Sequence, residues 1–244
     1  MHPAMNKIGR LGVIGDVHAE DVRLEMSLAH LEQEGVDAII CTGDIVDGAG
    51  CPDQVAGLLQ DYDVATVRGN HDRWLIENRA RHVPDAHQQA DLSDESMSYL
   101  ASLPTQIEIE TTLGKLLLCH GIGDNDLQKI WPGTPRLPME KSEQLDEIIS
   151  EGNYRFLING HMHYRSLIHF ETLTLLNAGT LKGLHRPGFS LIDFEQRDIT
   201  AFECDAKTVT FAKHLPLDPP QGSNPWSNTQ AFTGGWQPLV LYPD

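Results

Sequence analysis

Five short apolar runs in this chain each end in a residue that can bind a metal ion, and four of these residues directly follow a glycine. Such runs are typical of buried strands. In open α/β sheets, ligands bind at the carboxyl ends of the strands, where several loops meet. The fold is therefore expected to bring five strand ends to one place. The polar residues at these ends are Asp16, His18, Asp44, Asp47, Asn70, His71, Asp72, His120, His161 and His163.

The first third of the sequence alternates strand-like and helix-like segments. Apolar runs at 11–15, 37–43 and 63–67 are predicted strands, and the segments 19–35 and 53–60 are predicted helices. A β-α-β-α-β order predicts a parallel sheet covered by helices.

The alternation of strand-like and helix-like segments stops after residue 73. Two helix-like segments, 73–82 and 93–103, predict a helical insertion over 73–104. A hairpin is predicted over 106–121 with its turn near Gly114, followed by a helix at 142–150. The remaining runs up to residue 215 are mostly strands. We expect this β-rich second half to form a second sheet that packs face to face with the first.

The predicted domain covers residues 1–215, and residues 216–244 form a separate tail. The tail is rich in proline and contains two of the four tryptophans, Trp226 and Trp236. It is too apolar for a free linker. We expect it to pack on the domain, with a partner chain as the alternative and a homo-oligomer left open.

Composition excludes some partners. The formal net charge is −17, which argues against a nucleic-acid polymer or an anionic membrane surface as a ligand. A small anionic substrate stays compatible, because bound metal ions can reverse the local charge. The four cysteines are scattered, there is no secretory signal, and no apolar run is long enough to span a membrane. The expected location is the cytoplasm.

Seven of the strand-end residues form a plausible ligand set for two divalent ions. If Asp44 bridges the ions, each ion receives four bonds and keeps an open position. Extended backbone would aim Asp16 with His18, and His161 with His163, at a common point. A mixture of imidazole and oxygen donors suits manganese, iron or zinc. The seven expected ligands are Asp16, His18, Asp44, Asn70, His120, His161 and His163.

His71 is left outside this set. Its place beside Asn70 makes it a candidate general acid for a leaving-group oxygen. A carboxylate would orient its ring and fix its tautomer, and either Asp72 or Asp47 is available for this. Asp72 is therefore a candidate catalytic residue. Asp47 is also compatible with a simple capping role in its loop.

The blocks "GDVH", "GDIVD", "GNHD", "CHG" and "GHMH", followed by "LLNAGT", resemble the calcineurin-like metallophosphoesterase superfamily. The resemblance covers about 180 residues and implies a four-layer α/β/β/α sandwich with two mixed sheets flanked by helices. It also implies a binuclear centre with Asp44 bridging and His71 as the acid. One ion would be held by Asp16, His18 and His163, and the other by Asn70, His120 and His161.

Within the superfamily, the chain looks more like the small bacterial and archaeal phosphodiesterases than the protein phosphatases. Gly48 and Asp72 stand at the positions where sequences that look like protein phosphatases have Arg and Glu. The resemblance implies attack of a metal-bound hydroxide on small phosphodiesters, with monoesters as a further substrate class. Alternatives are a protein phosphatase, a dinucleoside polyphosphate hydrolase or a non-catalytic protein-binding scaffold.

Other residues carry weaker signals. Arg186 lies in the loop 182–188 and is a candidate contact for a substrate phosphate, although a solvated surface arginine is equally compatible. Trp226 and Trp236 are expected to be packing residues rather than a platform for stacking bases. The histidines outside the blocks are expected to be structural residues, namely His2, His30, His82, His87, His169, His185 and His214.

Overall fold

The computed structural model describes residues 7–243. Its first sheet has six strands in the order β11-β10-β9-β1-β2-β3. Strands β1, β2 and β3 are parallel, whereas β9, β10 and β11 run antiparallel to their neighbours. The strands span Arg10–Ile14 (β1), Ala38–Cys41 (β2), Ala65–Thr66 (β3), Gly188–Asp193 (β9), Asp198–Cys204 (β10) and Val209–Pro216 (β11).

The second sheet also has six strands, in the order β12-β7-β8-β6-β5-β4. Its central strands β5, β6 and β8 are parallel, and β4, β7 and β12 are antiparallel to their neighbours. The strands span Gln106–Thr111 (β4), Gly114–Cys119 (β5), Phe156–Asn159 (β6), Ser166–His169 (β7), Thr174–Asn177 (β8) and Leu239–Val240 (β12).

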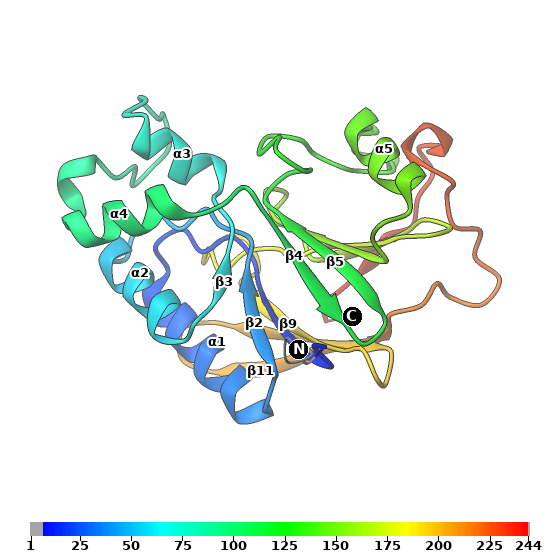
Figure 1. Cartoon of the computed structure of the whole chain (residues 1–244), viewed down its shortest axis with the longest axis horizontal. Coiled ribbons are helices and arrows are strands. Elements are labelled where there is room, and N and C mark those ends of the chain that lie inside the picture. Colours follow the sequence, from blue (N-terminus) through cyan, green and yellow to red (C-terminus); the bar gives the residue numbers. More distant parts are fainter. Residues whose placement is uncertain (1–6, 244) are drawn as a thin grey trace, which may run out of the picture.

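Helices cover the outer faces of both sheets, so the expected four-layer sandwich is confirmed. Figure 1 shows α1, α2 and α4 on one side of the molecule and α5 on the other. The helices span Asp21–Glu34 (α1), Pro52–Asp61 (α2), Asn70–Ile76 (α3), Asp94–Ser102 (α4) and Glu143–Glu151 (α5), with short 3-10 turns at Gln89–Asp91 and Thr229–Ala231.

Three apolar clusters fill the three spaces between the four layers. The first joins α1, α2 and α4 to the first sheet, the second lies between the sheets, and the third joins the second sheet to α5 and the tail. The run Leu116–Cys119 in β5 shows why a central strand is apolar throughout. Leu116 and Leu118 enter the middle cluster, whereas Leu117 and Cys119 enter the outer one, so neither face meets water.

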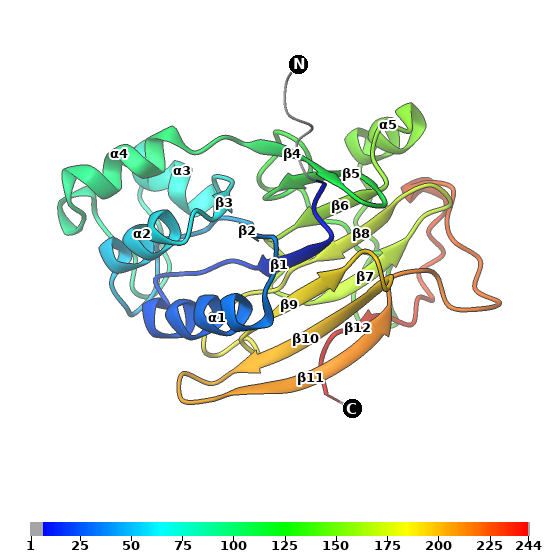
Figure 2. The same cartoon turned by 60° about the horizontal axis from the view of Figure 1, so that its bottom comes forward.

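Two predictions about the elements are wrong. Strands β9 to β11 extend the first sheet across the edge of β1, as Figure 2 shows, so the β-rich second half is shared between both sheets. The helix predicted at 73–82 begins at Asn70 and ends at Ile76. It begins early because the carboxylate of Asp72 accepts a hydrogen bond from the Gly69 N–H, and Asn78 takes a left-handed φ of 53° just past its end.

The tail contacts the body of the molecule at several points. Its strand β12 pairs with β7, and Phe232 is buried in the outer cluster beside α5. The N–H of Trp236 donates to the carbonyl of Gly133 at 2.9 Å. The boundary between a domain at 1–215 and a tail stays a prediction. Within residues 7–243 no helix is both long and apolar enough to span a bilayer.

Candidate metal centre

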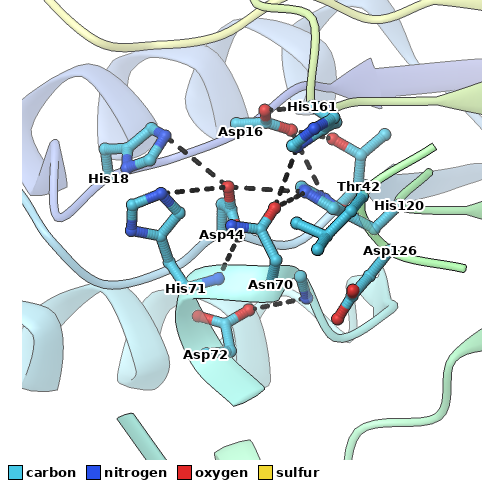
Figure 3. A network of polar contacts seen from close by, with 12 residues as sticks. Asp16, His18, Thr42, Asp44, Asn70, His71, Asp72, His120, Asp126 and His161 are labelled. Atoms are coloured by element: carbon cyan, nitrogen blue, oxygen red, sulfur yellow. Dashed lines mark hydrogen bonds and ion pairs between the residues drawn. The ribbon is translucent and has the colours of Figure 1, made fainter. Parts of the chain in front are cut away.

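The polar strand ends of both sheets meet at one edge of the sandwich. Asp16 and Asp44 follow β1 and β2, and Asn70 is the first residue of α3, just after β3. From the second sheet, His120 follows β5, and His161 with His163 follows β6. Figure 3 shows side chains from both sheets pointing toward the Asp44 carboxylate. The centre therefore lies where the two sheets face each other.

The backbone at this edge is left-handed rather than extended. His18 has a φ of 49° and Asp44 a φ of 48°, while His161 and His163 have φ values of 64° and 53°. Such angles are unfavourable for residues with a Cβ and cluster at functional sites. The expectation that extended backbone aims His161 and His163 at one point is wrong. They turn to different sides of Asp44.

Two glycines allow the loops to approach the carboxylates closely. A Cβ at Gly160 would lie 2.0 Å from Oδ1 of Asp16, and a Cβ at Gly69 would lie 2.2 Å from Oδ1 of Asp44. No side chain fits at these distances. The glycines that precede the polar residues are therefore needed for space around the carboxylates.

One group of donors consists of Asp16, His18, Asp44 and His163, whose ligand atoms all lie within 4.8 Å of one another. Nε2 of His163 lies 2.9 Å from Nε2 of His18 and 3.2 Å from Oδ2 of Asp16. Ligands with bonds of about 2.0–2.2 Å to one ion are separated by roughly 3 Å. These separations fit the donors of a single metal ion.

A second group is centred on the amide oxygen of Asn70. Its Oδ1 lies 2.9 Å from Nε2 of His120 and 2.9 Å from Nδ1 of His161. Nε2 of His120 lies 3.4 Å from Oδ2 of Asp44. This second group therefore matches the donors of another ion, and it contains an amide oxygen, two imidazoles and a shared carboxylate.

Oδ2 of Asp44 lies between the two groups. It is 3.4 Å from Nε2 of His120 and 3.8 Å from Nε2 of His18, both longer than ordinary hydrogen bonds. Its other oxygen accepts the N–H of His71 at 2.8 Å. Asp44 is buried, and a buried carboxylate charge is costly unless cations or close donors compensate it. Cations on both sides would satisfy it, so the residues present fit a binuclear centre.

Backbone carbonyls fix the tautomers of two candidate ligands. Nδ1 of His18 lies 3.1 Å from the carbonyl oxygen of Asp47, and Nδ1 of His120 lies 2.7 Å from that of Thr42. A ring that donates from Nδ1 keeps the lone pair of Nε2 free for a metal. Asp16 is held in turn by the hydroxyl of Thr42 and the N–H of His161, each at 2.8 Å.

The pKa values at the centre are strongly displaced. Burial alone would lower the pKa of His120, but Asp44 and Asp16 outweigh it and raise the value to about 10. Burial lowers the pKa of His18 to about 4, and burial together with the charge of His120 lowers that of His161 to about 4. Without metal, the protein thus keeps a proton on His120 between two carboxylates. A cation would replace that proton.

His71 lies beside the centre with its ring held by Asp47. Nδ1 of His71 is 2.7 Å from Oδ2 of Asp47, and Nε2 is 4.0 Å from Oδ2 of Asp44. Burial lowers the pKa of His71, but the hydrogen bond with Asp47 and the charge of Asp44 outweigh it, so the pKa lies above its usual value. When the ring is protonated, its Nε2–H faces the centre, because Nδ1 is held by Asp47.

Asp72 does not orient His71. Its carboxylate accepts hydrogen bonds from the backbone N–H groups of Ile45 at 2.8 Å, Val46 at 3.3 Å and Gly69 at 2.9 Å. It is completely buried, and burial together with the charge of Asp44 raises its pKa to about 6. The contacts that the structure gives Asp72 are structural, and a catalytic role for it stays a prediction. It ties the loop after β2 to the start of α3.

Two residues that contact Asp47 had no recognisable signal in the sequence. The guanidinium Nε of Arg81 lies 2.7 Å from Oδ2 of Asp47, and only 4% of the Arg81 side chain is exposed. The backbone N–H of His87 donates to Oδ1 of Asp47 at 2.9 Å, and the Arg81 guanidinium donates to the carbonyl of His87. His87 was expected to be an ordinary structural histidine. Its segment is irregular, so no periodic pattern marked it.

Of two residues in the loop 182–188, one differs from expectation. The guanidinium of Arg186 lies over the ring of Tyr242 at 4.1 Å and 3.6 Å from Glu203, with its side chain 55% exposed, so a contact with substrate phosphate stays a prediction. His185, which was assigned no functional role, has its Nδ1 2.7 Å from Nδ1 of His163. His185, rather than Arg186, is therefore the residue of this loop that contacts a candidate ligand.

A family model described as "Calcineurin-like phosphoesterase superfamily domain" matches residues 10–197. The uncharacterized protein MJ0912 of Methanocaldococcus jannaschii is 25% identical over 178 residues, which cover 70% of this chain and 69% of the relative.

Solved structures with the same fold include a hypothetical protein, PH1004, from Pyrococcus horikoshii, with a TM-score of 0.65, 18% identity and coverage of 80% of this chain and 88% of the other. A metallophosphoesterase from Sphaerobacter thermophilus has a TM-score of 0.56, 22% identity and coverage of 82% and 89%. Vps29 from Entamoeba histolytica, solved with Zn²⁺, has a TM-score of 0.53, 18% identity and coverage of 86% and 99%. At these identities the similarities show the fold alone.

Proposed function

The chain belongs to the calcineurin-like phosphoesterase superfamily, and we propose that it is a binuclear metal-dependent phosphodiesterase in which His71 is the general acid. Family membership and the buried Asp/His cluster support metal-dependent phosphoester hydrolysis. The observation that carries the finer proposal is the position of Asp44 Oδ2. It lies between two groups of donors and 4.0 Å from Nε2 of His71.

The two groups of donors would each hold one divalent ion, with manganese, iron and zinc as the candidates. Asp16, His18 and His163 belong to one group, and Asn70 with its two histidines belongs to the other. When bound, such ions stabilise negative charge on a phosphoryl group and make water a better nucleophile. Two divalent ions outweigh the charges of Asp16 and Asp44, which favours an anionic substrate in an acidic protein.

His71 would give its Nε2 proton to the departing oxygen of the ester. The bond from Nδ1 to Asp47 keeps the ring in place and stabilises its protonated form. Loss of the leaving group as an alcohol then needs no proton from water. This role depends on the ring orientation, which Asp47 sets, and not on Asp72.

A diester is favoured over a phosphoprotein by the loop after β2. Gly48 provides no side chain there, and a Cβ at this position would lie 1.7 Å from the carbonyl oxygen of His18. The protein phosphatase pattern has an arginine at this position, and this backbone leaves no room for its side chain. Dinucleoside polyphosphates stay a second substrate class, and monoesters a third, for the same centre.

The experiment is hydrolysis of bis(p-nitrophenyl) phosphate by metal-analysed protein with manganese added. We expect turnover by the wild type. We expect a loss of at least about 100-fold in Asp44→Asn, together with a lower metal content. Asp61→Asn is the matched control, because Asp61 is an exposed carboxylate at the end of α2. Full activity in Asp44→Asn would contradict the proposal.

A non-catalytic scaffold is the second candidate function, because Vps29 proteins share the fold. It predicts two bound ions without hydrolysis of phosphodiesters, phosphomonoesters, phosphopeptides or dinucleotides. That same substrate panel also ranks the alternative enzymes. A preference for phosphopeptides would favour a protein phosphatase, and a preference for dinucleotides would favour a polyphosphate hydrolase.

A further inference from the structure

A pocket of about 200 Å³ adjoins the metal centre on the side of His161. Met162, which lies between the candidate ligands His161 and His163 in the chain, forms part of its wall. The opposite wall comes from the segment 129–140, which lies outside the family-like blocks. Ligand pockets usually have about 300–1,000 Å³, so this one takes one ring system rather than a whole substrate.

The segment that forms this wall is ordered by its own hydrogen bonds. Trp131 and Glu140 exchange backbone hydrogen bonds of 3.1 and 2.8 Å, and the N–H of Thr134 donates to Leu137 at 2.9 Å. The tail supports the segment from behind, where the rings of Trp131 and Trp236 lie 5.0 Å apart, edge to face. The pocket is therefore a built feature and not a gap beside a loose loop.

The lining combines apolar surface with one charge of each sign. Leu137 and Pro138 supply apolar wall from the segment, and Leu137 is 53% exposed. An exposed leucine beside a polar centre is informative, because exposed apolar patches often mark binding sites. Trp131, Lys129 and Glu140 also line the pocket. Apolar walls with both a cation and a carboxylate suit a flat ring that carries polar atoms better than an aliphatic chain.

The pocket lies away from the general acid. Figure 3 shows His18 and His71 on one side of Asp44, and His120 with His161 on the other. The leaving group must be near His71 to receive its proton. The pocket beside His161 is therefore positioned for the organic group that stays on phosphorus.

We propose that this pocket binds the nucleobase of a nucleoside phosphodiester and that the nucleotide half is retained on phosphorus. The inference rests on the proposed function, which places phosphate at the metal centre. The ring packs between Met162 and Leu137, and its polar edge meets Lys129 and Glu140. The substrate class is thus a nucleoside monophosphate esterified with a second alcohol.

The first test keeps the leaving group constant and changes the retained group. The p-nitrophenyl ester of thymidine 5′-phosphate is compared with methyl p-nitrophenyl phosphate, and kcat/KM is measured for each with the manganese-loaded protein. The two substrates differ in intrinsic reactivity, but this difference is the same for every variant. It therefore cancels when the ratio of the two kcat/KM values is compared between the wild type and a variant. We expect Leu137→Ser to lower this ratio about 5- to 10-fold, as loss of one apolar contact does.

Leu127→Ser is the matched control. Leu127 lies in the same loop and is 46% exposed, but it does not line the pocket. Its ratio should equal that of the wild type. An unchanged ratio in Leu137→Ser, or an equal fall in both variants, overturns the proposal while leaving phosphodiester hydrolysis intact.

The second test does not need catalysis. Calorimetry on the manganese-loaded protein compares adenosine 5′-monophosphate with ribose 5-phosphate, which differ only in the base. We expect about tenfold tighter binding of the nucleotide, lost in Leu137→Ser and kept in Leu127→Ser. Equal binding of both ligands by the wild type overturns the pocket assignment. Base-dependent binding without hydrolysis of any ester supports the pocket and contradicts the proposed enzyme.

Discussion

Oδ2 of Asp47 lies 2.7 Å from Nδ1 of His71, and this contact determines which ring nitrogen faces the metal centre. The same oxygen lies 2.7 Å from Nε of Arg81. Asp47 therefore joins the His71 imidazole to the Arg81 guanidinium. It connects the irregular segment 77–88 to the proposed general acid.

Removing this acid is expected to slow hydrolysis without removing metal. His71→Ala should lower kcat by about 10²–10⁴ for esters of poorly acidic alcohols, because these need a proton as they leave. The loss should be smaller for p-nitrophenyl esters, whose leaving group is stable as an anion. Kinetics with both leaving groups, together with elemental analysis of the protein, measure this. An equal loss for both would contradict general acid catalysis.

Asp47→Asn should produce the same pattern with a smaller loss, about 10- to 100-fold, because the ring remains but loses its charged partner. The measurement is the ratio of rates for the two leaving groups. A fall that tracks metal content instead would show that Asp47 acts through the ligand loops. In that case its contact with His71 would be incidental.

Arg81 is expected to affect kcat more than KM, since its guanidinium contacts Asp47 rather than the centre. Arg81→Ala should lower kcat about tenfold, and Arg81→Lys should restore part of it by returning a cation. Arg79→Ala is the matched control, because Arg79 is 57% exposed and pairs with Glu77. Steady-state kinetics on the three variants decide this. A rise in KM alone would assign Arg81 to substrate binding.

Asp72 is expected to stabilise the fold. In the wild type, the N–H groups of Ile45 and Gly69 both donate to the Asp72 carboxylate. Asp72→Asn replaces one acceptor oxygen with an NH₂ donor, which should lower the free energy of unfolding by about 1–3 kcal/mol. Urea unfolding measures this, with Asp61→Asn as the exposed control. Activity per folded molecule should change far less than in His71→Ala. An unchanged unfolding midpoint would show that these hydrogen bonds contribute nothing net.

His169 predicts a pH dependence of stability that is separate from the metal centre. Burial lowers its pKa to about 4 from 6.5. Between these values the unfolded chain binds a proton that the folded chain does not, so the contribution is present above pH 6.5 and is lost as pH falls through 4. The loss is up to about 1.4 kcal/mol per pH unit.

Urea unfolding of metal-free protein from pH 7 to pH 4.5 measures this effect. His169→Asn should lose stability less steeply on acidification than the wild type. His82→Asn, at an exposed position, should keep the wild-type slope. Parallel curves for the wild type and His169→Asn would show that the buried imidazole does not titrate as described.

The fold and the candidate ligands were predictable where the sequence pattern is local. Apolar runs mark strands whose faces are both covered, and the polar residue after each run lies at a strand end because the chain turns there. The pairing of β9 with β1 was not predictable, because sheet membership of an antiparallel strand depends on tertiary packing. Figure 2 shows β9 between β1 and β10, so β9 lies beside a strand from the far end of the sequence as well as beside its own neighbour in the chain.

The surroundings of the general acid were less predictable. Arg81 and His87 lie in a segment without periodicity, and only the folded backbone brings them to Asp47. The sequence left open whether Asp72 or Asp47 orients His71, and the structure gives the contact to Asp47, because the first turn of α3 directs the Asp72 carboxylate to backbone N–H groups. Helical geometry places neighbouring side chains on different faces.

The donors for each ion come from both sheets, and this has a mechanical consequence. An ion held by Asp16 and His163 would join the loop after β1 to the loop after β6, and its neighbour would join Asn70 to His120. The ions would then cross-link the two sheets of the sandwich. Separation of the two sheets at this edge would first require release of the metal ions. The metal-bound protein should therefore open there far more rarely than the metal-free protein.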